Sequence, residues 1–271
     1  MRRSWLIFGL IGTAGMLAGC GPGTSKPEPL RLAAASDLRQ ALPVLIAAFR
    51  QDHSIEVEPI FGSSGQLAEQ IRQGAPFDLF LSANRGFVDR LAGAGVVAAG
   101  SVQPYARGTL VLAINPVFAH HPKSLKDLTD PAIKSIAIAN PDLAPYGIAA
   151  KQALERLNLW DTLKPKLVPA ESVHQALQFV RSGSAEVGFV SRGLTDAPGL
   201  ELMALPANSH DPIIQYLGVV ARSARKGDAQ AFAAFMSGPV GQAMLVDLGF
   251  GPVAAAAPAT KGTPAPQPVS P

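Results

Sequence analysis

Hydrophobic positions along this chain fall into two patterns, which alternate through most of its length. Short, mainly apolar runs of five to seven residues predict β-strands at 30–35, 55–61, 78–82, 109–114, 135–139 and 186–190. Between them, apolar residues recur every three or four positions around 38–49, 149–157 and 173–180, which predicts amphipathic helices. Because strands and helices alternate, the pattern predicts an α/β fold with parallel crossovers.

The N-terminus has the pattern of a secretory signal. Two arginines, Arg2 and Arg3, precede an apolar stretch at 5–17, which is too short for a stable membrane helix. The string Leu-Ala-Gly-Cys at 17–20 follows directly and resembles the lipobox of bacterial lipoproteins. We therefore expect residues 1–19 to be removed and Cys20 to be lipidated. Ordinary signal cleavage beside an incidental cysteine is the alternative interpretation.

Segments rich in proline, glycine and small residues flank the folded body. Residues 20–29 predict a flexible tether, and residues 254–271 predict a disordered tail, because neither can bury enough apolar area to offset the entropy of ordering. The body at 30–253 is large for one open sheet, so its length favours two similar α/β lobes.

Composition and charge exclude several classes of protein. The chain is 48% hydrophobic and 16% charged, and no apolar run long enough to span a membrane follows the N-terminal segment. Its formal charge of +3 loses two positive charges with the signal, so we expect no nucleic-acid partner. A single cysteine excludes an intrachain disulfide framework. The adjacent His120 and His121 lack zinc-ligand spacing and predict a solvated loop.

Candidate chemistry lies where the predicted helices begin. Short strings of small, hydroxyl-bearing or proline residues precede them at 35–38, 62–66, 144–148 and 171–174. A helix start presents N–H groups without intrahelical partners and a partial positive charge, so several such starts directed at one point would form an anion site. Ser36 and Ser64 would contribute hydroxyl groups there. Simple capping of helices is the alternative interpretation of these two serines.

A family resemblance rests on five strings, which occur in the order and spacing of the molybdate-binding proteins of bacterial ABC importers. They are AAAS at 33–36, FGSSG at 61–65, GAPFDLFLSA at 74–83, APYG at 144–147 and PAESV at 169–173. The resemblance spans 30–251 and implies a two-lobed α/β fold of the periplasmic-binding-protein type II, with a mainly parallel sheet flanked by helices in each lobe. It places lobe 1 at 30–106 and 217–253, and lobe 2 at 107–216. Residues 109–114 and 213–220 are the expected crossing strands.

The resemblance also implies a set of ligand contacts. Ser36 and Ser64 match hydroxyl-bearing positions of the first lobe, and Tyr146 and Val173 match positions that donate from helix N-termini in the second. Some family members have a ligating tyrosine where this chain has Ser191, so either the Tyr146 hydroxyl or its backbone N–H is expected to supply that contact. Asp37 could offer its backbone N–H, but its carboxylate would disfavour a nearby dianion unless it faces outward.

These residues predict a binding protein and not an enzyme. Molybdate and tungstate are fully ionised oxyanions, which suit a site made of donors alone, and hydrogen phosphate needs an acceptor. We expect no cofactor and no direct metal-ion ligand, since molybdenum is bound as its oxyanion. The expected partner is an ABC permease, and the protein is expected to be a monomer outside the cytoplasm on a lipid anchor. Alternatives are a binding protein for another oxyanion such as sulfate and a sensory surface lipoprotein; a serine hydrolase is disfavoured because no G-x-S-x-G string occurs.

Overall fold

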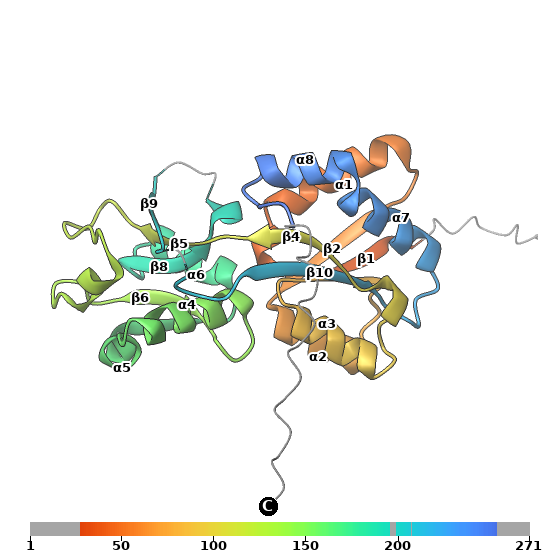
Figure 1. The fold of residues 1–271 in the computed structure, drawn as a ribbon. Coiled ribbons are helices and arrows are strands. Elements are labelled where there is room, and N and C mark those ends of the chain that lie inside the picture. The colour runs from red at the N-terminus through yellow and green to blue at the C-terminus, as the bar shows by residue number, and fades with distance from the viewer. Residues whose placement is uncertain (1–27, 196–198, 207, 254–271) are drawn as a thin grey trace, which may run out of the picture.

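Two five-stranded sheets form the framework of the computed structural model, which describes residues 28–195, 199–206 and 208–253. Each sheet carries its own helices, so the chain forms two α/β lobes that lie side by side (Figure 1). Both ends of the described chain belong to the first lobe, and its middle forms the second. This is the two-lobed architecture that the sequence predicts.

The sheet of the first lobe has the strand order β2-β1-β3-β10-β4. The strands are β1 (Leu30–Ala35), β2 (Val57–Gly62), β3 (Leu79–Ser82), β4 (Gln103–Gly108) and β10 (Ile213–Val219). One face packs against α1 (Ala41–Asp52), α7 (Lys226–Ser237) and α8 (Pro239–Asp247), and the other against α2 (Ser64–Arg72) and α3 (Arg85–Gly93). Strand β1 shows the alternation: Leu32 and Ala34 join the first cluster, and Ala33 joins the second.

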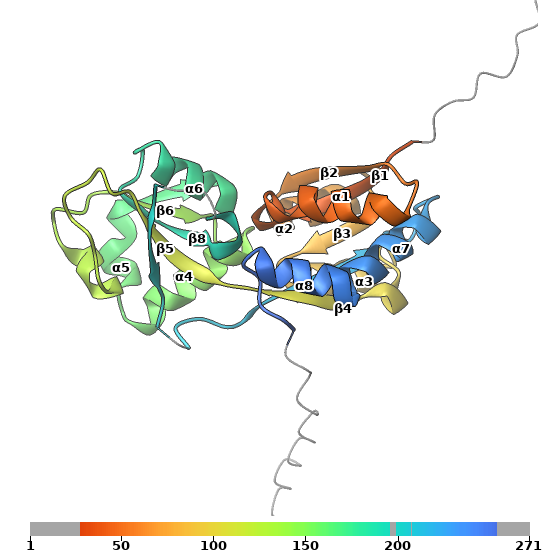
Figure 2. The ribbon, with the colours of Figure 1, turned by 90° about the horizontal axis from the view of Figure 1, so that it is seen from above.

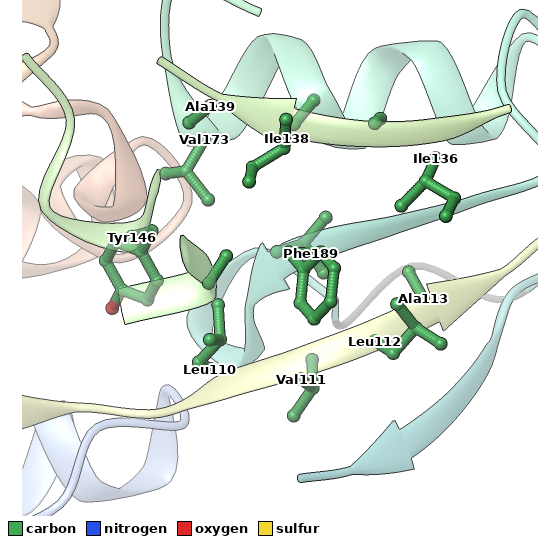
Figure 3. Packing of buried hydrophobic residues seen from close by; sticks show 14 of the residues in the cluster. Leu110, Val111, Leu112, Ala113, Ile136, Ile138, Ala139, Tyr146, Val173 and Phe189 are labelled. Atoms are coloured by element: carbon green, nitrogen blue, oxygen red, sulfur yellow. The ribbon is translucent and has the colours of Figure 1, made fainter. Parts of the chain in front are cut away.

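The sheet of the second lobe has the order β7-β6-β8-β5-β9. Its strands are β5 (Leu110–Ile114), β6 (Ile136–Ala139), β7 (Leu167–Ala170), β8 (Val187–Ser191) and β9 (Glu201–Ala204). The helices are α4 (Pro145–Arg156), α5 (Trp160–Leu163) and α6 (Val173–Arg181). Phe189 lies among the aliphatic side chains of this core, and Tyr146 lies at its edge with its hydroxyl directed away from it (Figure 3).

Short 3-10 helices connect these elements. They are η1 (Ser36–Leu38), η2 (Ala99–Ser101), η3 (Leu125–Thr129), η4 (Lys164–Lys166) and η5 (Arg192–Leu194). The first of them, η1, follows β1 directly and leads into α1.

Each sheet is mixed, which refines the expectation of mainly parallel sheets. Strand β1 runs parallel to β2 and β3, while β10 runs antiparallel to β3 and β4. In the second sheet, β6 runs parallel to β7 and β8, while β5 runs antiparallel to β8 and β9. The antiparallel members are the strands next to the two lobe crossings. Strands β5 and β10 enter their sheets from the other lobe, and β4 and β9 lead out of theirs, so they lack the helical crossover that makes neighbouring strands parallel.

The chain crosses between the lobes twice. Strands β4 and β5 form one extended segment interrupted at Thr109, with β4 in the first sheet and β5 in the second. The return crossing lies between β9 and β10, and β10 then pairs with β4 from Ile213 opposite Gly108 onward, so the two connections run together (Figure 2). The lobe boundaries expected from the sequence fall inside this β4–β10 ladder.

Among the residues that the structure describes, no helix is long and apolar enough to cross a membrane. Cys20, the expected signal segment 1–19 and the expected tail 254–271 lie outside the described residues.

Candidate functional site

A small pocket lies between the lobes, at the point where several helices begin. Its volume is ≈ 10 Å³, about the space that one water-sized sphere occupies. Ser36 and Ser64 line it from η1 and α2 of the first lobe, and Tyr146 and Val173 line it from α4 and α6 of the second. The structure therefore brings together the four residues expected to hold the ligand. Also lining the pocket are Ala35, Asp37, Gly62, Ser63, Ala83, Ala144 and Pro145.

The two serines of the first lobe do not cap helices. The N-cap of α2 is Ser63, whose hydroxyl accepts a hydrogen bond from the Gln66 N–H, and η1 has Ala35 as its N-cap. Ser64 is fully buried, and its Oγ accepts a hydrogen bond from the Ala83 N–H at 3.1 Å. This bond uses the Ser64 oxygen as an acceptor and leaves the hydroxyl proton to donate.

The second lobe directs two helix N-termini at the pocket. Helix α4 begins with Pro145 and Tyr146, and α6 begins at Val173 after the N-cap Ser172. The N–H groups of a first helical turn have no intrahelical acceptor, and the macrodipole favours negative charge beside them. Gly147 allows α4 to start close to the end of β6, because a Cβ atom there would lie 2.1 Å from the Ala139 carbonyl oxygen.

A hydrogen-bonded network connects the pocket to the lobe crossing. The Tyr146 hydroxyl donates to Asp37 Oδ2 at 3.0 Å and accepts from the Ser191 hydroxyl at 3.0 Å. Gln215 of β10 donates its side-chain amide to the same Asp37 oxygen, and the Tyr105 hydroxyl of β4 donates to Gln215 Oε1 at 3.1 Å. Ser191 does not line the pocket and reaches it only through Tyr146.

The structure does not turn the Asp37 carboxylate outward. Its carboxyl group is 1% exposed and directed at Tyr146 and Gln215, so it remains inside the protein beside the pocket. Burial raises the pKa of this carboxyl from 3.8 to about 6, against the lowering effect of hydrogen bonds from Tyr146 and Gln215 and from the backbone N–H groups of Asp37 and Leu38. Gln215 and Tyr105 were not expected in the network, because only the fold brings β4 and β10 to η1.

Contacts between the lobes flank the pocket. The Gly65 N–H at the start of α2 donates to the Leu143 carbonyl of the second lobe at 2.9 Å. The Gln40 side chain, before α1, donates to the Leu194 carbonyl of η5 at 2.8 Å. The lobes thus meet through backbone and side-chain hydrogen bonds around the pocket.

Serine hydroxyls and the N–H groups of helix starts are the potential donors of this pocket. Among the described residues that line it, none is lysine, arginine or histidine, and Asp37 is the one carboxylic acid. Backbone N–H groups and serine hydroxyls can pair with a bare oxyanion, and the partial charges of converging helix ends compensate its charge. Two α/β lobes that meet over such a pocket are the arrangement of a solute-binding protein.

Comparisons with known proteins agree with that class. The family model described as bacterial extracellular solute-binding protein matches residues 30–251. The molybdate-binding protein ModA of Azotobacter vinelandii is 33% identical, over 88% of this chain and 94% of its own length. ModA of Escherichia coli K12 is 30% identical, over 92% of this chain and 99% of its own length. The chain belongs to the bacterial extracellular solute-binding proteins and, within them, to the family of the molybdate-binding proteins.

Solved structures show the same fold. The periplasmic molybdate-binding protein of Azotobacter vinelandii superposes with a TM-score of 0.76 at 33% identity, covering 82% of this chain and 98% of its own. The sulfate-binding protein SubI of Mycobacterium tuberculosis reaches a TM-score of 0.73 at 20% identity, covering 83% and 87%, and shares the fold alone. These relatives are solute-binding proteins.

Proposed function

We propose that this protein captures molybdate, and tungstate as well, between its lobes and delivers it to an ABC importer outside the cytoplasm. The observation that carries the proposal is the convergence of Ser36, Ser64, Tyr146 and Val173 on one pocket between the lobes. The relatives that are 30% and 33% identical over most of the chain are named for molybdate binding, which supports this choice of oxyanion.

The chemistry of the pocket suits a fully ionised oxyanion. Removing a dianion from water costs many kcal/mol, so donors must surround it in the protein. About six hydrogen bonds to a charged acceptor, at roughly 1.5–3 kcal/mol each, contribute about 10–20 kcal/mol in gross terms. The Ser36 and Ser64 hydroxyls and the N–H groups at the starts of η1, α2, α4 and α6 are the donors that we assign to this role.

Selectivity among oxyanions tests the proposed function. In calorimetric titrations of the domain at 28–253, we expect tight binding of molybdate and tungstate, much weaker binding of sulfate and no measurable binding of hydrogen phosphate. Sulfate is smaller, so the closed lobes contact it less well, and the proton of hydrogen phosphate would lack an acceptor among the serine hydroxyls and N–H groups that we assign to the anion. Equal affinities for sulfate and molybdate would refute the ligand assignment and leave the fold unaffected.

We further propose that Cys20 anchors the protein to a membrane by a lipid. The Leu-Ala-Gly-Cys string supports this, as does similarity to a putative substrate-binding lipoprotein of Bacillus subtilis, 29% identical over 92% of this chain. In cells labelled with a radioactive or clickable fatty acid, the wild-type protein should incorporate the label and fractionate with membranes. Cys20→Ser should lose both properties and retain molybdate binding. An unlipidated wild-type protein whose mature N-terminus lies elsewhere would contradict the anchor.

A further inference from the structure

The two oxygens of the Asp37 carboxyl group differ in their hydrogen bonding. Oδ2 accepts hydrogen bonds from Tyr146 and Gln215. Oδ1 is buried and has no partner in hydrogen-bond geometry among the described residues, although the backbone N–H groups of Asp37 and Leu38 lie close enough to the carboxyl group to lower its pKa. Because Asp37 also lines the pocket, this unpartnered oxygen belongs to a side chain that a bound anion would adjoin. A buried polar atom without a partner carries a desolvation cost, which a ligand atom can relieve.

Charge decides which form of this carboxyl suits a bound dianion. An ionised Asp37 would add a like charge beside the anion, and no lysine, arginine or histidine among the described lining residues offsets it. Like charges in a buried site favour the neutral form of an acid. Burial raises the pKa of Asp37 to about 6, so in the ligand-free protein the neutral form persists to a higher pH than it does for an ordinary carboxyl group. A nearby dianion would raise that pKa further.

We propose that Asp37 binds the oxyanion as a neutral acid, with a proton on Oδ1 donated to an oxygen of the anion and Oδ2 accepting from Tyr146 and Gln215. The inference rests on the proposed function and adds a residue that determines its specificity. Above about pH 6, binding then takes one proton from the solvent onto Asp37, and no covalent bond of the anion changes. An ionised Asp37 would instead be an acceptor, which suits a protonated anion such as hydrogen phosphate.

Other titratable groups near Asp37 do not account for such a proton. Tyr146 of α4 and Tyr105 of β4 have pKa values raised well above 10, chiefly by burial, so both phenols stay neutral. His174 follows Val173 on α6, and burial lowers its pKa, with the charges of Arg39 and Arg181 acting in the same direction. This imidazole is therefore mostly neutral above pH 6.5, and within this group Asp37 is the residue that gains a proton on binding.

Calorimetric titration with molybdate from pH 6.5 to pH 8.5, in two buffers of different ionisation enthalpy, tests the proposal. The wild-type affinity should fall as the pH rises, by up to about tenfold per pH unit, because each bound anion requires one proton. The difference between buffers should show proton uptake that approaches one per anion. Asp37→Asn presents an amide donor in place of the acid proton, so it should bind independently of pH and more tightly than the wild type at pH 8.5.

Two further variants separate this role from general effects of charge. Asp142→Asn removes a carboxylate that is exposed, in the loop before α4, and should keep the wild-type pH dependence. Tyr146→Phe removes a donor that lowers the pKa of Asp37, so the pH at which affinity starts to fall should move upward. Wild-type binding that is constant over this range without proton uptake, or an Asp37→Asn variant with the wild-type pH dependence, would overturn the inference alone. No molybdate binding at any pH would refute the proposed function itself.

Discussion

Replacing Ser64 with alanine is expected to weaken molybdate binding by about 10- to 150-fold while the melting temperature of the ligand-free protein changes little. The Ser64 oxygen already accepts a hydrogen bond from the Ala83 N–H, so its proton is directed to another acceptor. Loss of a donor to a buried charge costs about 1.5–3 kcal/mol, which corresponds to this range of affinity. Ser36→Ala should lose affinity by the same reasoning, since Ser36 lines the pocket and does not cap η1. Calorimetry and thermal unfolding measure the two quantities separately.

The matched control for these variants is Ser172→Ala. Ser172 caps α6 through the Gln175 N–H and does not line the pocket. Loss of a helix cap destabilises a protein by about 1 kcal/mol, so this variant should melt earlier and bind molybdate with nearly wild-type affinity. If Ser64→Ala and Ser36→Ala instead showed the Ser172→Ala pattern, their hydroxyls would have a structural role and no contact with the anion.

Five of the six predicted strands are almost wholly buried, so their apolar runs give a local signal; the sixth, β2, is a half-buried edge strand whose apolar residues alternate with polar ones. The six predicted strands are all present within two residues of their expected bounds, as β1, β2, β3, β5, β6 and β8. Strands β4, β7 and β9 were not predicted. Each contains a proline or exposed polar positions and lies at the edge of a sheet, where one side of the strand needs no apolar partner. Their pairing depends on neighbours that are distant in sequence.

The residues of the candidate site also fall into a group that the sequence predicts and a group that it does not. Ser36, Ser64, Tyr146 and Val173 were predictable because each stands at a helix start, where residue type and position together indicate a donor. The roles of Asp37 and Gln215 were not predictable, because 178 residues separate them and no local pattern shows their contact. The sequence did not decide whether the Tyr146 hydroxyl or its backbone N–H contacts the anion. In the structure it is engaged by Asp37 and Ser191, which favours the Tyr146 backbone N–H as its contribution to the anion.

Closure of the lobes depends on Gly65, so Gly65→Ala should weaken molybdate binding by about 5- to 150-fold. A Cβ atom on this residue would lie 2.8 Å from the Leu143 carbonyl oxygen, which accepts the Gly65 N–H across the lobe interface. Overpacking of this kind costs about 1–3 kcal/mol, and a ligand-free protein whose lobes separate at this contact avoids the cost. Within its own lobe the new methyl group meets the edge of the Phe87 ring at 3.1 Å, and alanine improves helix propensity over glycine by about 1 kcal/mol. The melting temperature of the ligand-free variant should therefore stay close to that of the wild type.

Gly93→Ala is the control that isolates closure from helix propensity. Gly93 lies at the exposed end of α3, where an added Cβ meets nothing within 4 Å, so this variant should keep the wild-type affinity. Small-angle scattering with saturating molybdate gives a second measurement. The radius of gyration of the wild type should decrease on binding, and that of Gly65→Ala should decrease less, because the methyl group holds the Leu143 loop away from α2. A Gly65→Ala protein with wild-type affinity and full compaction would show that the liganded lobes do not meet at this contact.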